Sequence, residues 1–137
     1  MKIQELRIGN LVKCKTSNDS AIYSVIQIDG FGLKVRLSHP RHTEFTPIDR
    51  IKPITLTEEI LLRCGLTQKG SLFGIGFLDT IYWYHIENQI LYIEYTDSPF
   101  SEDEGTRYPI SSPIKHLHVL MNIIYDLTGR ELEYVEG

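Results

Sequence analysis

The sequence predicts an α+β protein, with a run of short strands at the amino terminus followed by mixed helices and strands. Turn residues separate short apolar runs up to residue 53, and helix-start signals follow near residues 55 and 112. Residues 1–53 carry nine Lys and Arg against five acids, a net charge of +4. Residues 54–137 carry five against thirteen, a net charge of −8, and the two sum to −4. We therefore expect two segments, 1–53 and 54–137, the second packing as one compact unit.

The composition limits the class of protein. A chain of 137 residues with 42% apolar and 23% charged residues is the size of one ordinary domain with a substantial core. The first ten residues lack the apolar region of a signal peptide, and no apolar run approaches the ~20 residues that span a bilayer. Cys14 and Cys64 are far apart and belong to no CxxC pair, which argues against a zinc cluster or a disulfide framework. We expect a soluble, cytoplasmic protein without a membrane partner.

The first segment is predicted to be a small closed barrel. We expect strands at 6–12, 21–29 and 31–37, and a last strand or single helical turn at 43–51. Leu33, Val35 and Leu37 alternate with Lys34 and Arg36, which indicates a half-buried strand with its basic side outward. Because such short strands cannot bury their apolar faces in an open sheet, we predict an SH3-like barrel over residues 1–53.

The second segment is predicted to contain helix, meander and helix. A capping threonine, Thr55 or Thr57, begins a helix that ends at Gly65. Three strands of an antiparallel meander are expected at 71–78, 81–87 and 90–95. Residues 98–109 contain the acidic run Glu102-Asp103-Glu104 and are predicted to form a loop that could become ordered on binding. Ser112 and Pro113 begin a C-terminal helix that ends at Gly129 and packs on the meander.

Three blocks of the sequence carry a resemblance to a known family. They are Glu5-Leu6-Arg7-Ile8-Gly9-Asn10-Leu11-Val12, the run 51–59 (IKPITLTEE), and residues 116–132 from His116-Leu117-His118 to Gly129-Arg130-Glu131-Leu132. Together they resemble uncharacterised small proteins of Bacteroides-type bacteria and their prophages or mobile elements. The resemblance implies a source and a one-piece architecture, and it carries over no activity or catalytic residue.

The histidines and glycines predict no metal or cofactor site. His116 and His118 lie two apart on the predicted helix, about 200° apart around its axis, so they cannot chelate one ion together. His39 and His42 flank one loop and could supply two ligands, but the spacing suggests no third. The run 74–76 (GIG) lacks the third glycine of a dinucleotide fingerprint and indicates a bulge or a close backbone approach. We therefore expect no cofactor.

One face of the predicted hairpin carries mixed aromatic and polar side chains. A two-residue turn at 88–89 would place Trp83 opposite Glu94 and His85 opposite Tyr92, with Glu87 on the same face. Trp beside His and Tyr has the composition of a binding hot spot. Our first hypothesis is therefore a non-enzymatic interaction module, encoded by a prophage or mobile element, that binds an unknown protein partner. The alternatives are that the rest of the chain or a second subunit covers this face, or that an enzyme site lies there.

The basic side of the first segment predicts the alternative function. Lys34 and Arg36 point outward from one strand, and Arg41 follows in the next loop. Phe31 and Phe45 could stack on bases, which would suit an accessory protein that binds nucleic acid. A net charge of −4 argues against strong non-specific binding. The same basic surface could instead contact the acidic part of the chain or of a homodimer mate.

Overall fold

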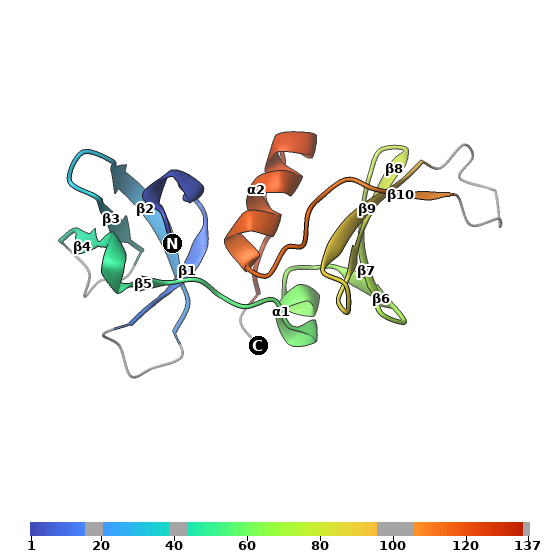
Figure 1. Cartoon of the computed structure of the whole chain (residues 1–137), viewed down its shortest axis with the longest axis horizontal. Coiled ribbons are helices and arrows are strands. Elements are labelled where there is room, and N and C mark those ends of the chain that lie inside the picture. Colours follow the sequence, from blue (N-terminus) through green and yellow to red (C-terminus); the bar gives the residue numbers. More distant parts are fainter. Residues whose placement is uncertain (16–20, 39–43, 96–105, 136–137) are drawn as a thin grey trace. The chain divides into compact units, whose positions relative to one another are not determined.

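The chain folds as an α+β protein with two five-stranded antiparallel sheets, one short helix and a C-terminal helix (Figure 1). The structure is a computed structural model that describes residues 1–15, 21–38, 44–95 and 106–135. Its contacts divide the chain into two compact units. The first unit contains residues 1–55 and 116–131, and the second contains residues 56–115 and 132–137. The predicted boundary at Pro53 lies two residues before the end of the first stretch.

The first unit is built on a sheet with the strand order β4-β3-β2-β1-β5. Its elements before the C-terminal helix are two 3-10 helices, η1 (Ile3–Glu5) and η2 (Ile48–Arg50), and the strands β1 (Leu11–Cys14), β2 (Tyr23–Asp29), β3 (Lys34–Leu37), β4 (Thr46–Pro47) and β5 (Ile51–Lys52). In β1 and β3 buried residues alternate with half-buried ones, because successive strand residues point to opposite faces. The inward residues form one core that includes Val12, Tyr23, Val25 and Leu37.

The predicted barrel is only partly matched. Residues 43–51 were expected to form a strand or a helical turn, and the structure has both, with η2 between β4 and β5. No closed barrel is found among the strands that the structure describes, since β4 and β5 stand at the two edges of the sheet order. The β2–β3 register shifts by one residue between Val25 and Gln27, a bulge that bends this sheet.

The second unit contains the helix α1 (Glu58–Arg63) and a sheet of order β10-β9-β8-β7-β6. Its strands are β6 (Thr67–Lys69), β7 (Leu72–Phe77), β8 (Thr80–His85), β9 (Ile90–Tyr95) and β10 (Arg107–Pro109). The predicted three-stranded meander is present as β7, β8 and β9. One short strand extends it at each edge, β6 beside β7 and β10 beside β9. These edge strands were missed because most of their residues are polar or exposed, so they lack the apolar alternation that predicts a strand. The loop predicted over 98–109 is therefore wrong at Arg107–Pro109, and its acidic run Glu102-Asp103-Glu104 lies outside the described residues.

The short helix begins where the sequence left two alternatives. Thr57 is the N-cap, since its hydroxyl accepts a hydrogen bond from the Ile60 amide at 3.2 Å. Glu58 and Glu59 occupy the first turn, where the partial positive charge of the helix dipole favours acids. Gly65 follows the helix with a φ of +86°, a left-handed conformation that favours glycine. The predicted end of this helix is confirmed.

The C-terminal helix α2 (Leu117–Thr128) starts later than predicted. The amide of Ile114 donates to the Gln89 carbonyl and the amide of Leu117 donates to the Ile54 carbonyl, at 2.7 and 2.8 Å. These bonds hold residues 114–116 in an extended conformation, so Pro113 does not begin the helix. Gly129 ends α2 in the left-handed conformation, as predicted.

Contacts group α2 with the first unit, although the sequence placed this helix with the meander. Asn122 accepts a hydrogen bond from the Asn10 side chain at 2.7 Å and donates to the Glu5 carbonyl at 2.8 Å. The Arg7 guanidinium pairs with Glu131 and lies 4.0 Å from the centre of the Tyr125 ring. These polar contacts attach α2 to the first ten residues. None of the helices in the described ranges is long and apolar enough to cross a membrane.

Candidate functional site

The β8–β9 hairpin has the predicted faces but a different register. Trp83 lies opposite Tyr92, and His85 lies opposite Ile90. The predicted pairing of Trp83 with Glu94 and of His85 with Tyr92 is therefore wrong by two residues. The connection contains four residues, 86–89, and Gln89 adopts a φ of +64°. A two-residue shift keeps every side chain on its face, since side chains alternate with a period of two.

The mixed face of this hairpin is partly buried within the second unit. Trp83 is 8% exposed and Glu94 is 5% exposed, while His85 and Tyr92 are half-buried. The indole lies against the backbone of Gly74, where an added Cβ would come within 2.5 Å of a ring carbon. This contact confirms the predicted close backbone approach at Gly74, whereas a Cβ at Gly76 would meet nothing within 4 Å. Trp83 is therefore a packed residue of the second unit, which agrees with the alternative that the chain itself covers part of this face.

Glu94 and Arg107 complete the packing around Trp83. The indole nitrogen donates to Glu94 Oε2 at 3.4 Å, and Arg107 Nε lies 3.4 Å from Glu94 Oε1. The Arg107 guanidinium also lies 5.2 Å from the centre of the Trp83 ring. A carboxylate this deeply buried needs a cationic or hydrogen-bonding partner, and it has one here. These contacts indicate a structural role for Glu94.

The other polar residues of the face hold the hairpin turn together. His85 Nδ1 accepts a hydrogen bond from the Asn88 amide at 3.3 Å. The Asn88 side-chain amide donates to the Tyr92 hydroxyl at 2.9 Å, and Ser71 donates to Glu87 at 3.1 Å. An acid–base pair would need groups directed at a shared space. His85, Glu87 and Tyr92 instead use polar atoms in local turn bonds.

The histidines and cysteines in the described parts of the chain form no metal-binding group, and Cys64 is buried. No group of three or more His, Cys, Asp or Glu there could hold a metal ion, and His39 and His42 lie outside these parts. The His116 and His118 rings stack with centres 6.0 Å apart, because His116 is the N-cap of α2 and not a helical residue. Burial raises the pKa of Cys64 to about 11, which disfavours the nucleophilic thiolate.

The predicted basic residues of β3 point outward as expected, and one of them, Lys34, has an acidic neighbour. Lys34 and Arg36 alternate with the buried Val35 and Leu37. Lys34 Nζ lies 3.9 Å from Asp29 Oδ2 and 5.3 Å from the centre of the Phe45 ring. Part of the Lys34 charge is therefore offset by a neighbouring acid. Arg41 lies outside the described residues.

A second basic surface, with more basic residues than the one on β3, lies on β1, β5 and η2. The sequence pattern did not predict it. Lys13 in β1 lies directly opposite Lys52 in β5. The amide of Lys15 donates to the carbonyl of Arg50 at 2.8 Å. Lys15 and Arg50 therefore lie opposite each other, two residues along the same strand pair from Lys13 and Lys52. We call Lys13, Lys15, Arg50 and Lys52 the basic strip. None of the four takes part in an ion pair with any other residue that the structure describes.

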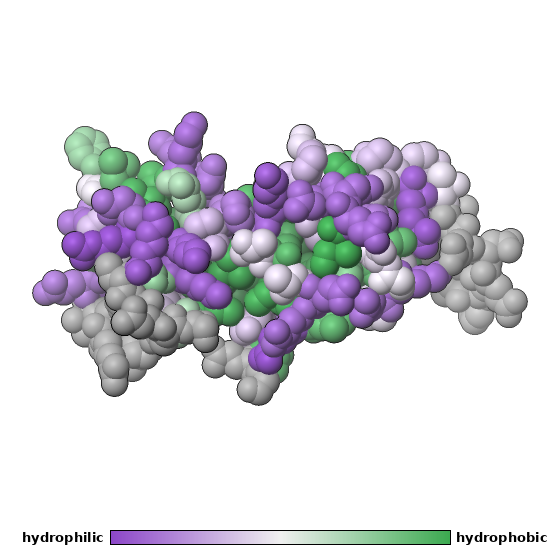
Figure 2. All heavy atoms as spheres, turned by 60° about the horizontal axis from the view of Figure 1, so that its bottom comes forward, coloured by the Kyte–Doolittle hydropathy of each residue, from purple (hydrophilic) through white to green (hydrophobic). Residues whose placement is uncertain are grey.

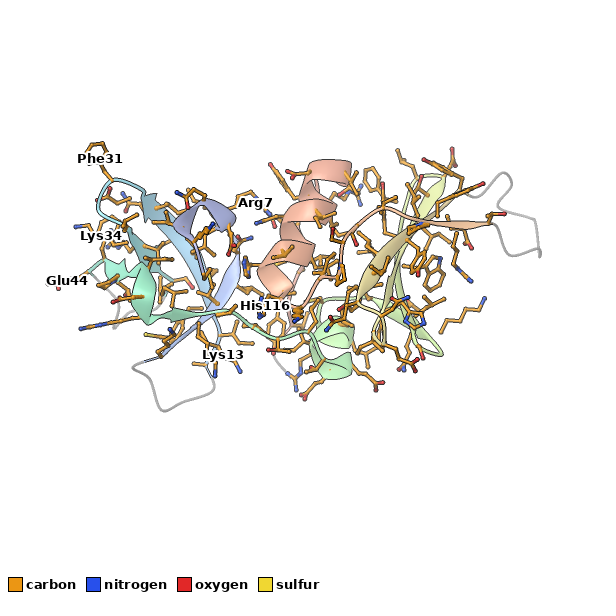
Figure 3. All side chains as sticks on the ribbon, viewed as in Figure 1. Arg7, Lys13, Phe31, Lys34, Glu44 and His116 are labelled. Carbon is orange, nitrogen blue, oxygen red and sulfur yellow. The ribbon has the colours of Figure 1, made fainter. Side chains whose placement is uncertain are left out.

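The sequence does contain a signal for this strip. Cys14 separates Lys13 from Lys15, and Ile51 separates Arg50 from Lys52. Cys14 and Ile51 are buried partners in the same strand pair, so the basic residues beside them point outward. Lys13 is labelled at the lower edge of the first unit in Figure 3, and Figure 2 brings that face forward. Described side chains of the first unit are mostly hydrophilic on this face.

Opposed like charges have an energetic cost in a sheet. Directly opposite residues in an antiparallel pair have Cβ atoms about 4.5–5.5 Å apart, and like charges there are destabilising by roughly 0.2–1 kcal/mol. Lys13 and Lys52 pay this cost without a compensating acid among the described residues. An anion that bound between them would remove the repulsion.

Comparisons of the chain with protein-family models, curated proteins and solved structures found no match.

Proposed function

We propose that this protein is a non-enzymatic nucleic-acid-associated protein whose first unit binds the phosphate backbone through the basic strip. The observation that carries this proposal is the opposition of Lys13 to Lys52 and of Lys15 to Arg50, with no acid paired to any of them in the described structure. Adjacent strands lie about 4.8 Å apart, and residues two apart on a strand lie about 6.6 Å apart. The four positive charges of the basic strip therefore lie close together on the outer face of the β1–β5 pair.

Nucleic acid is the polyanion that best matches four charges so close together. Each Lys or Arg that neutralises a phosphate releases condensed counterions, and this release supplies most of the free energy of non-specific binding. The strip contains no aromatic side chain, so it favours contacts to phosphates that do not depend on base sequence.

Acidic groups limit the strength of this binding. Asp49 lies in η2 next to Arg50, and the chain as a whole carries a net charge of −4. Long-range attraction is therefore weak, and the local cluster must supply the affinity. We expect dissociation constants in the range of about 10⁻⁴ to 10⁻⁶ M that is typical of non-specific binding at physiological salt.

The arrangement of the first sheet supports an SH3-like assignment as part of this proposal. Five short strands follow the order β4-β3-β2-β1-β5, and the single turn of η2 joins the two edge strands β4 and β5. A chain connection this short brings the two edges close together, which favours a small barrel.

The alternative of a protein partner at the β8–β9 face receives less support. Trp83 and Glu94 are buried, so the aromatic anchor that this hypothesis needs is not available at the surface. His85 and Tyr92 are half-buried and remain candidates for contact only at the margin of that face.

Binding by matched charge-neutralised variants tests the proposal. Lys13→Gln/Lys52→Gln removes two charges from the strip, and Lys2→Gln/Lys115→Gln removes two from exposed positions outside it. Fluorescence anisotropy with a labelled 20-base-pair duplex and a labelled oligonucleotide of the same length measures the dissociation constants. We expect the strip variant to bind at least ten times more weakly than the wild type and the control. Equal loss in both variants, or no binding by the wild type, would contradict the proposal.

A further inference from the structure

The β2–β3 turn presents two large apolar side chains to solvent. Phe31 is fully exposed, and Figure 3 shows it at the outer end of this turn. Leu33 is 52% exposed and has a φ of +51°, a left-handed conformation that a bulky residue rarely adopts. Strained backbone of this kind persists where the surrounding structure enforces it.

Hydrogen bonds hold the turn in this conformation. Asp29 Oδ1 accepts from the amides of Phe31 and Gly32, at 3.1 and 3.0 Å. An added Cβ at Gly32 would come within 2.8 Å of Asp29 Oδ2, so this position suits glycine. Phe31 is therefore held on an ordered turn, which lowers the entropy lost when it contacts a ligand.

The turn and the basic strip are joined through η2. The amide of Ile48, the first residue of η2, donates to the carbonyl of Leu33 at 2.9 Å. Arg50, the last residue of η2, accepts from the amide of Lys15 at 2.8 Å. A 3-10 helix rises about 2.0 Å per residue, so Ile48 and Arg50 are separated by only about 4 Å along its axis. Leu33 and Arg50 thus adjoin the two ends of η2, while Figure 3 shows Phe31 at the outer end of the turn and Lys13 at the lower edge of the first unit.

We infer that Phe31 stacks on an unpaired base of a single strand whose phosphates lie along the basic strip. This inference rests on the proposed function. An aromatic side chain and a positively charged track on one unit form the combination that binds single strands, because every base offers a flat face for stacking. Phe31 and Lys13 lie at different edges of the first unit (Figure 3), so the stacked base belongs to a nucleotide several positions away from the phosphates on the strip. Leu33 contacts the edge of the same base, and Lys34 lies next in sequence to meet an adjoining phosphate. The partner class is a single-stranded or unpaired segment of DNA or RNA.

The test compares Phe31→Ala with Leu78→Ala. Leu78 is the control, because it is also a large apolar residue exposed in a hairpin turn but lies in the second unit. The probes are a labelled 12-nucleotide single strand, with 2-aminopurine at its centre, and a labelled duplex. We expect Phe31→Ala to bind the single strand roughly ten times more weakly and to lose quenching of the 2-aminopurine, since stacking contributes strongly per base. Phe31→Trp should restore both, and duplex binding should not change.

The outcomes separate this inference from the proposed function. If the wild type binds neither probe, the proposed function itself fails. If the wild type binds both and Phe31→Ala binds the single strand equally well, the strip proposal stands and the stacking inference is overturned. Equal weakening of single-strand and duplex binding would also overturn it, because a stacking contact requires an unpaired base. Far-UV circular dichroism confirms that each variant is folded.

Discussion

Neutralising Lys52 should make the free protein more stable while weakening its binding to nucleic acid. Lys52 lies directly opposite Lys13 across the β1–β5 pair, and neither has an acidic partner among the described residues. Most substitutions lower stability, so a gain at a surface position needs a specific cause. The cause here is the relief of repulsion between two ammonium groups on one face of the sheet.

The magnitude follows from the pair geometry. Like charges directly opposite each other cost roughly 0.2–1 kcal/mol, and because Lys52 is exposed and screened by water we expect the lower half of that range, about 0.2–0.5 kcal/mol. Screening shortens the reach of the repulsion to about 10 Å at 0.1 M salt and about 3 Å at 1 M. The gain should therefore be present at 20 mM NaCl and absent at 1 M NaCl.

Urea denaturation of four proteins measures this effect. The set is wild type, Lys13→Gln, Lys52→Gln and the double variant, followed by far-UV circular dichroism at both salt concentrations. Each single variant removes the whole Lys13–Lys52 repulsion, so the gain of the double variant should be smaller than the sum of the two single gains. Lys2→Gln provides a control for the loss of one surface charge. A loss of stability in Lys52→Gln at low salt, or fully additive gains in the double variant, would refute the reasoning.

Two further predictions concern packing and pH. Gly74→Ala should lower the free energy of unfolding by about 1–3 kcal/mol, because the new methyl group overlaps the Trp83 ring. The shift of the urea midpoint measures this loss, and an unchanged midpoint would contradict the close packing of Trp83 on Gly74. His118 is 1% exposed, and burial lowers its pKa while the nearby Glu5 opposes this shift. A lowered pKa means that the unfolded state binds the proton more readily, so stability should fall as pH drops below 6.5, the ordinary value of histidine. His118→Leu should remove this fall between pH 7 and 5, and an unchanged pH profile would show that another group is responsible.

Residue alternation predicted the faces of the strands well. Lys34 and Arg36 point outward while Val35 and Leu37 are buried, as their period of two indicates. The faces of the β8–β9 hairpin also follow the prediction, although its register does not. The turn decided the register: a two-residue turn at 88–89 looked sufficient, whereas Gln89 adopts a left-handed conformation that no sequence rule at a glutamine predicts.

Tertiary hydrogen bonds explain the misplaced start of α2. Ser112 and Pro113 are good local helix-start signals, but the amides of Ile114 and Leu117 bond to distant carbonyls at Gln89 and Ile54. Local sequence does not contain that information. The surroundings of His118 depend on this start as well, since a helix that begins at Leu117 makes contacts different from one that begins at Pro113. The structure buries it.

Exposure could not be predicted from the composition of a face alone. Trp83 and Tyr92 share a face, but the absence of a side chain at Gly74 lets the indole lie against the neighbouring strand. The basic strip was equally hidden, because the β1–β5 pairing joins residues almost forty positions apart. Each half of the strip alternates basic and buried residues, and only the register shows that the two halves oppose each other.

Salt dependence of nucleic-acid binding tests the central claim most directly. The slope of log Kobs against log salt concentration counts the phosphates that the protein neutralises, at about 0.9 per phosphate for duplex DNA. We would measure this slope for wild type, Lys13→Gln/Lys52→Gln and Lys2→Gln/Lys115→Gln between 20 and 200 mM NaCl. If the basic strip holds phosphates, the strip variant loses about two units of slope and the control keeps the wild-type value. An equal slope in all three proteins would show that the strip does not contact the nucleic acid.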